Sequence, residues 1–261
     1  MHVIFADGIG SNNPGVNREE SVLYSVVKRL SVLNKEYKED RVEWPASMAM
    51  VGGTKSWNES TRIGISEINK VVSEIGKDRF ILLGYSGGCR VIHEWMEQNP
   101  NDLERVTSVG LLSDPFRPKN RNVVGVPKTK GWGICGQKKG PIPDRTFWAA
   151  NPGDVITDAL PNSLLRTAAD ASDVMPYEML GELHRHLMKG DLQLAHQLNL
   201  FRTNPLTWFT NLQPRFDQAR IDIQGYLGEE HTTAYLKTYA GGGSLAHRLA
   251  EAVNWQATRS N

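Results

Sequence analysis

The sequence has few cysteines and no excess of charge of one sign. Two cysteines in 261 residues are too few for a disulfide framework or a zinc site. We expect Cys89 and Cys135 to be free thiols, with a bridge between them as the alternative. The 30 basic and 29 acidic residues are well mixed and leave a net charge of +1. This balance argues against a nucleic-acid partner and against a polybasic membrane anchor.

Long apolar runs are also missing. No stretch is long enough to cross a bilayer, and the chain does not open with a basic segment followed by an apolar one. Residues 2–6 already have the pattern of a buried strand. We therefore expect no transmembrane segment and no signal peptide, and a protein that is soluble where it is made.

One serine lies in a pattern of strand, sharp turn and helix. The apolar run 80–84 leads into Gly84-Tyr-Ser86-Gly-Gly88, and apolar residues at helical spacing follow: Val91, Ile92, Trp95 and Met96. In a nucleophile elbow the backbone at the serine is strained, so its neighbours must be small, and the helix points its first N–H groups at the serine oxygen. The alternative is a glycine-rich loop with a surface serine. We predict that Ser86 is a nucleophile.

The order of the remaining elements predicts an α/β fold. We expect strands at 2–6, 41–44, 80–84, 106–112 and 146–150, and helices at 16–33, 56–75, 88–99 and 245–253. Strands that alternate with helices imply a mainly parallel sheet with helices on both faces. From about 161 to 227 the pattern changes to helices broken by prolines. We predict a core of residues 1–160 and 228–261 and a helical insertion at 161–227.

A serine nucleophile needs a base and an acid, which follow it along the chain in an α/β-hydrolase. His231 alone among the seven histidines lies in a loop after the last core segment, so it is the predicted base. Two aspartates compete for the acid. Asp154 follows the later strand on a Pro-Gly turn and is the better choice, and Asp114, after the strand at 106–112, is the alternative.

The developing negative charge on an ester needs two backbone donors. The N–H of Gly87, directly after the nucleophile, is one, and the glycine loop after the first strand supplies the other, at Ile9. No cofactor is expected: Gly131 to Gly136 formally match GxGxxG, but no strand precedes them and prolines follow where a helix should begin. No metal site is expected either.

These residues resemble the cutinase-like serine esterases of the α/β-hydrolase fold, and among them the Lysin B esterases of phages that infect mycobacteria and related actinobacteria. The segments that carry the resemblance are Phe5-Ala-Asp-Gly-Ile-Gly10, Trp44-Pro45, Gly84-Tyr-Ser-Gly-Gly88, Ser113-Asp-Pro-Phe-Arg117, Gly133-Ile134, Pro152-Gly-Asp154 and His231 with Tyr235. An insertion between acid and histidine is also typical of Lysin B. Two positions depart from the family: Gly87 replaces a glutamine, and Asp7 stands where a histidine often occurs.

The resemblance implies hydrolysis of the ester that joins mycolic acids to arabinogalactan, with Ser86, His231 and Asp154 as the triad and Gly87 and Ile9 as the oxyanion hole. It implies a lipid ester as the substrate, a monomeric enzyme, and action at the host envelope after the host membrane has been disrupted. A general cutinase or lipase is the alternative within enzymes. An inactive module that binds the cell envelope is the alternative from another class.

Overall fold

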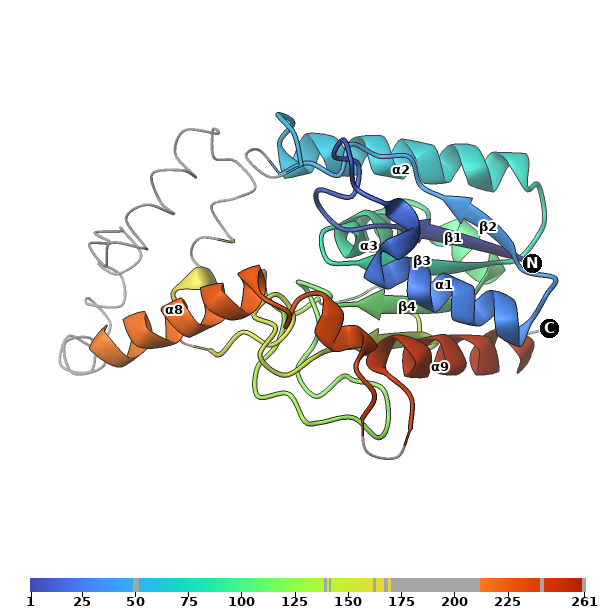
Figure 1. The fold of residues 1–261 in the computed structure, drawn as a ribbon. Coiled ribbons are helices and arrows are strands. Elements are labelled where there is room, and N and C mark those ends of the chain that lie inside the picture. The colour runs from blue at the N-terminus through green and yellow to red at the C-terminus, as the bar shows by residue number, and fades with distance from the viewer. Residues whose placement is uncertain are drawn as a thin grey trace.

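The computed structural model describes residues 1–259 except 49–51, 139, 141, 162, 167–168, 170–211 and 240–241. Most of the predicted insertion at 161–227 lies outside these described residues, so its boundaries stay a prediction. The elements described within or beside it are α8 (Leu212–Leu227), the 3₁₀ helix η3 (Thr233–Leu236) and α9 (Leu245–Arg259). Figure 1 shows α8 extending away from the sheet.

Five parallel strands form one sheet in the order β2-β1-β3-β4-β5. Their bounds are β1 (His2–Ala6), β2 (Lys38–Arg41), β3 (Phe80–Tyr85), β4 (Val106–Leu112) and β5 (Thr146–Ala149). Every residue of β1, β3 and β4 is buried, as expected for strands covered on both faces. The predicted α/β class, with a parallel sheet and helices on both faces, is confirmed.

The second strand was predicted at 41–44, and this position is wrong. The strand is Lys38–Arg41, at the edge of the sheet, where residues that face water can be charged. Val42 and Trp44 are buried, but they lie beyond the strand and pack into the core as part of the following segment. Their burial produced the apolar signal, because periodicity reports burial and not the hydrogen-bonded ladder itself.

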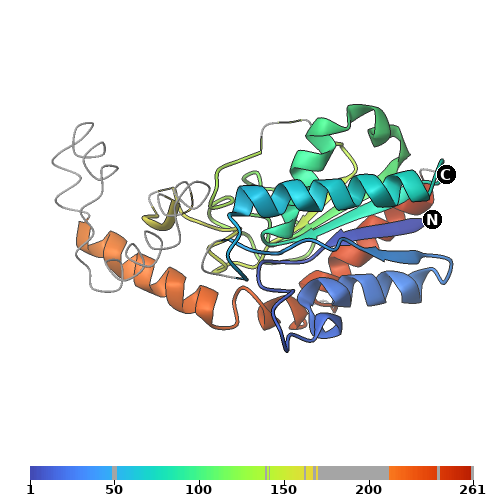
Figure 2. The ribbon, with the colours of Figure 1, turned by 90° about the horizontal axis from the view of Figure 1, so that it is seen from above.

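Helices cover both faces of the sheet (Figures 1 and 2). One face packs on α1 (Val22–Leu33) and α9, and the other packs on α2 (Trp57–Glu74) and α3 (Gly88–Gln98). Alternate residues of β1 point to opposite faces of the sheet. Val3 and Phe5 pack in the core with α1 and α9, and Ile4 and Ala6 pack in the core with α2 and α3. The sheet therefore has no face left open to solvent along its central strands.

Local signals set where the first two helices begin. The Ser56 side chain accepts a hydrogen bond from the Glu59 N–H, so α2 starts where the capping pattern predicted. The first helix was predicted from residue 16, but α1 begins at Val22, because Ser21 caps it by accepting from the Tyr24 N–H. Residues Arg18–Glu20 before the cap form the 3₁₀ helix η1, and a further 3₁₀ helix, η2, spans Pro100–Arg105.

Cys89 and Cys135 are thiols that are not joined by a disulfide, as predicted. In the part of the chain that the structure describes, none of the helices combines the length and apolar character needed to cross a membrane.

Candidate active site

Ser86 lies on the sharp turn between β3 and α3. Its φ of 51° is in the left-handed region, which a residue with a side chain adopts only under strain. The turn leaves no room for a side chain two positions before Ser86 or two positions after it. A Cβ atom at Gly88 would lie 2.2 Å from the Ala6 carbonyl oxygen, and one at Gly84 would lie 2.9 Å from the Cα of Cys89. The strand, turn and helix predicted around Ser86 are therefore present, with the geometry of a nucleophile elbow.

His231 and Asp154, both buried, lie in contact. The His231 Nδ1 atom is 3.1 Å from Asp154 Oδ1 and 3.2 Å from Oδ2. Asp154 follows β5 on a turn, and His231 follows α8, so the contact joins positions 77 residues apart. A carboxylate on Nδ1 fixes the tautomer of the ring and leaves Nε2 to accept a proton.

The elbow and His231 lie beside each other. The ring of Tyr85, the residue before Ser86, stacks on the His231 imidazole with centroids 5.3 Å apart and an interplanar angle of 22°. The Tyr85 hydroxyl also donates a hydrogen bond of 2.5 Å to the His231 carbonyl oxygen. Tyr226, from α8, packs on the same imidazole at 4.9 Å. These contacts hold the imidazole at the end of β3.

Two further donors to Asp154 were not assigned a role from the sequence. The Ser113 hydroxyl donates to Asp154 Oδ2 over 2.5 Å, and the Tyr235 hydroxyl donates to the same oxygen over 2.6 Å. Burial and then the charge of Asp154 raise the pKa of Tyr235 well above its ordinary value of 10, so this hydroxyl keeps its proton. One signal for Ser113 was available: it directly follows β4, as Ser86 directly follows β3.

Asp114, the alternative acid, has different partners. Its Oδ2 atom is 2.9 Å from His93 Nε2 and accepts from Trp148 Nε1 at 2.9 Å, and its Oδ1 accepts from the Phe116 N–H. Burial alone would raise the pKa of Asp114, but the interactions with His93 and these donors outweigh it and hold that pKa below its ordinary value. Of the two aspartates, Asp154 is the one in contact with His231.

The two segments predicted to supply the oxyanion hole meet. A Cβ atom at Gly87 would lie 2.5 Å from Ile9 Cγ1, so the Ile9 side chain packs directly on Gly87. The loop that carries Ile9 is held by a hydrogen bond of 2.7 Å from the Gly10 N–H to the Ala46 carbonyl oxygen. Ile9 therefore occupies the space that a side chain at position 87 would need.

Asp7, the other departure, is buried beneath this loop. Its Oδ2 atom accepts from Arg41 Nη1 at 2.7 Å and from the Ser21 hydroxyl at 2.9 Å. Burial raises the pKa of Asp7, and these two partners oppose the shift. Asp7 therefore links β1 to β2 and to the start of α1.

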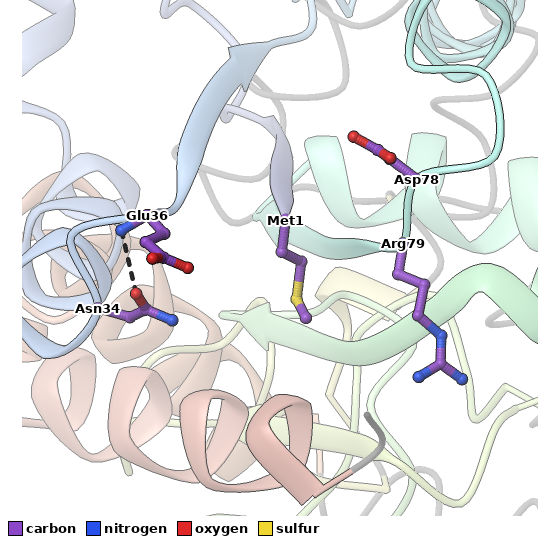
Figure 3. A pocket seen from close by; sticks show the side chains of 5 residues that line it. All are labelled: Met1, Asn34, Glu36, Asp78 and Arg79. Carbon is purple, nitrogen blue, oxygen red and sulfur yellow. Dashed lines mark hydrogen bonds between the residues drawn. The ribbon is translucent and has the colours of Figure 1, made fainter.

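A separate hollow lies at the end of the strands opposite to the elbow (Figure 3). It is lined by Met1, Asn34, Glu36, Asp78 and Arg79. Met1 precedes β1, and Asp78 and Arg79 precede β3, so the hollow is at the amino ends of strands whose carboxyl ends carry the elbow. It takes no part in the arrangement around Ser86.

No family model matches this chain, and no curated protein matches it. Solved structures that resemble it include a cutinase-like protein from Cryptococcus sp., with a TM-score of 0.47 and 16% identity over 60% of this chain and 78% of that one. They also include lysin B from Mycobacteriophage D29, with a TM-score of 0.47 and 13% identity over 88% of this chain and 94% of that one. An acetylxylan esterase matches with a TM-score of 0.44 and 16% identity over 87% and 98% of the two chains.

These likenesses are in fold only. At such identities and TM-scores they assign neither a substrate nor a reacting residue to this chain. The chemistry rests on the geometry. The His231 Nδ1 atom contacts a buried carboxylate, and the imidazole stacks on the tyrosine that precedes Ser86 on its strained turn. An imidazole oriented in this way can act as a base toward a nearby hydroxyl.

Proposed function

We propose that this protein is a serine esterase that cleaves the ester bond between mycolic acids and arabinogalactan. The observation that carries the proposal is the contact between His231 Nδ1 and Asp154, at 3.1 Å, beside the elbow that bears Ser86. A buried His–Asp pair next to a strained serine supports acyl transfer through a covalent intermediate.

In the proposed reaction the Ser86 hydroxyl attacks the ester carbonyl carbon while His231 Nε2 takes its proton. The negative charge that forms on the carbonyl oxygen is stabilised by the N–H groups of Gly87 and Ile9. The imidazolium then protonates the leaving sugar oxygen, and the acyl group stays on Ser86. Water, deprotonated by His231, releases the fatty acid and restores the serine.

Two features support a lipid ester as the substrate. The sequence segments around Ser86, Asp154 and His231 resemble those of Lysin B. In addition, exposed apolar side chains lie on the elements next to His231: Ile221 and Leu227 of α8, and Leu236 of η3. Exposed apolar side chains on the elements that flank His231 in the chain are compatible with a substrate that carries an acyl chain. The proposal includes action as a monomer at the envelope of the bacterial host, after the host membrane has been disrupted during phage lysis.

The experiment has two stages, with Ser86→Ala as the matched control. A fluorophosphonate probe should label Ser86, as located by mass spectrometry, and the control should not be labelled. Purified mycolyl-arabinogalactan should then release free mycolic acids with the wild type and not with Ser86→Ala. Labelling at a different residue would contradict the assignment of the nucleophile.

The remaining outcomes separate the alternatives. Labelling of Ser86 with turnover of short nitrophenyl esters or triglycerides, but no release of mycolic acids, would favour a general cutinase or lipase. Binding to cell-wall material with no labelling and no turnover would favour an inactive module of the cell envelope.

A further inference from the structure

Two neighbouring strands end in the same unusual way. Ser86 directly follows β3 and Ser113 directly follows β4, and both have a φ of 51°. Each is held by a backbone hydrogen bond to the adjacent strand: the Ser86 N–H donates to the Leu112 carbonyl oxygen and the Ser113 N–H to the Ala149 carbonyl oxygen, both at 3.0 Å. A residue with a side chain persists in this conformation only where its surroundings enforce it, and such strain gathers at functional sites.

The Ser113 hydroxyl contacts both Asp154 and His231, the acid and the base of the proposed reaction. It donates to Asp154 Oδ2 over 2.5 Å, and it is 3.1 Å from His231 Nδ1. Ser113 is fully buried, so water does not compete for these contacts. The left-handed backbone directs the hydroxyl toward Asp154 and His231.

The residue after Ser113 is fixed by a second buried pair. Asp114 is in contact with His93 Nε2 and with Trp148 Nε1, each at 2.9 Å. His93 lies on α3 and Trp148 on β5, so these contacts join the helix of the elbow to the strand beyond β4. The proposed reaction does not use this pair. It fixes the residue directly after the strained backbone at Ser113.

We propose that Ser113 is a positioning residue of the active site, whose hydroxyl keeps the Asp154 carboxylate oriented on His231. The contacts of Asp114 with His93 and Trp148 hold Ser113 in the conformation that this requires. The inference rests on the proposed function, because it assigns Ser113 a role in the same reaction. An error in orientation of well under 1 Å is enough to slow such a reaction.

The test compares Ser113→Ala with Ser113→Gly. Both remove the hydroxyl, and kcat for a nitrophenyl ester should fall about 10- to 100-fold in both, the range for a hydrogen bond to a charged group, with KM unchanged. Their stabilities should differ, because only glycine adopts a φ near 51° without strain. The Gly variant should melt about 2–4 °C above the Ala variant. If the two variants lose the same kcat but differ in melting temperature, the loss of activity is due to the missing hydroxyl and not to a change in packing.

A control variant separates relief of strain from loss of the hydroxyl. Asn120 is exposed in the loop after β4 and has a φ of 63°. Asn120→Gly therefore places a glycine at another left-handed position, away from the site, and its kcat should equal that of the wild type. A double-mutant cycle completes the test. In an Asp154→Ala background, Ser113→Ala should change kcat by less than about 2-fold, because the hydroxyl acts through the carboxylate.

Two results would overturn the inference. One is a kcat of Ser113→Ala within about 2-fold of the wild type. The other is a loss in the Asp154→Ala background as large as the loss in the wild type. Failure of the proposed function is distinguishable, because it would appear in the wild type itself as no labelling of Ser86 by the fluorophosphonate probe. With Ser86 labelled in the wild type, the labelling rate of Ser113→Ala should fall in proportion to kcat.

Discussion

The most discriminating substitution is Asp154→Asn. The Asp154 carboxylate accepts hydrogen bonds from the Ser113 and Tyr235 hydroxyls and contacts His231 Nδ1 at 3.1 Å. An asparagine has nearly the same shape but carries an NH₂ group in place of one oxygen. With two hydroxyl donors at Oδ2, the NH₂ group can turn toward His231 and donate to Nδ1. The imidazole would then hold its proton on Nε2, which could no longer take one from Ser86.

The expected magnitude follows from this change of tautomer. The same substitution in the serine-protease triad lowers kcat by about 10⁴-fold with the geometry intact, which corresponds to about 5.4 kcal/mol in the barrier. We expect a loss of this order for Asp154→Asn. The assay is steady-state hydrolysis of a nitrophenyl ester, with circular dichroism to establish that the variant is folded.

Asp114→Asn is the matched control. Asp114 is equally buried and also contacts an imidazole, that of His93, but it does not contact His231. We expect Asp114→Asn to lower kcat by no more than about 10-fold, because it acts only through the backbone at Ser113. A larger loss in Asp114→Asn than in Asp154→Asn would refute the assignment of Asp154 as the acid.

Four other predictions concern single contacts. Ser86→Ala should remove ester hydrolysis and leave the circular dichroism spectrum unchanged; residual turnover at the wild-type rate would exclude Ser86 as nucleophile. Tyr235→Phe removes one donor to the acid and should lower kcat about 10-fold at constant KM. Gly87→Ala should cost about 1–3 kcal/mol of unfolding free energy, measured by urea titration, because its Cβ would meet Ile9 Cγ1 at 2.5 Å, and adding Ile9→Ala should recover most of it. The pKa of Asp114 is lower in the folded protein than its ordinary value of 3.8. The ionised carboxylate therefore stabilises the fold fully above that pH, and this contribution is lost as the pH falls through the folded-state pKa. The difference in melting temperature between wild type and Asp114→Asn should therefore shrink below pH 3.8; a constant difference would contradict it.

Short-range patterns were sufficient for much of the fold. The strand at Val106–Leu112, the start of α2 after Ser56 and the turn at Ser86 were all predicted from neighbouring residues. Each depends on interactions within a few positions: an apolar run, a capping side chain, and glycines beside a strained serine. The edge strand at Lys38–Arg41 was predicted too late in the chain, at 41–44, because its pairing with β1 is a long-range contact that its charged residues do not signal.

The sequence alone predicted a nucleophile elbow at Ser86 and, by order along the chain, His231 as the candidate base. It favoured Asp154 as the acid with Asp114 as the alternative, and it gave Ser113 no role. Only the tertiary structure brought Asp154 to His231, across 77 residues, and placed Asp114 on His93. The physical reason is that both aspartates lie at the carboxyl ends of strands in one parallel sheet. The packing of the helices and loops at that end of the sheet determines which histidine each aspartate contacts.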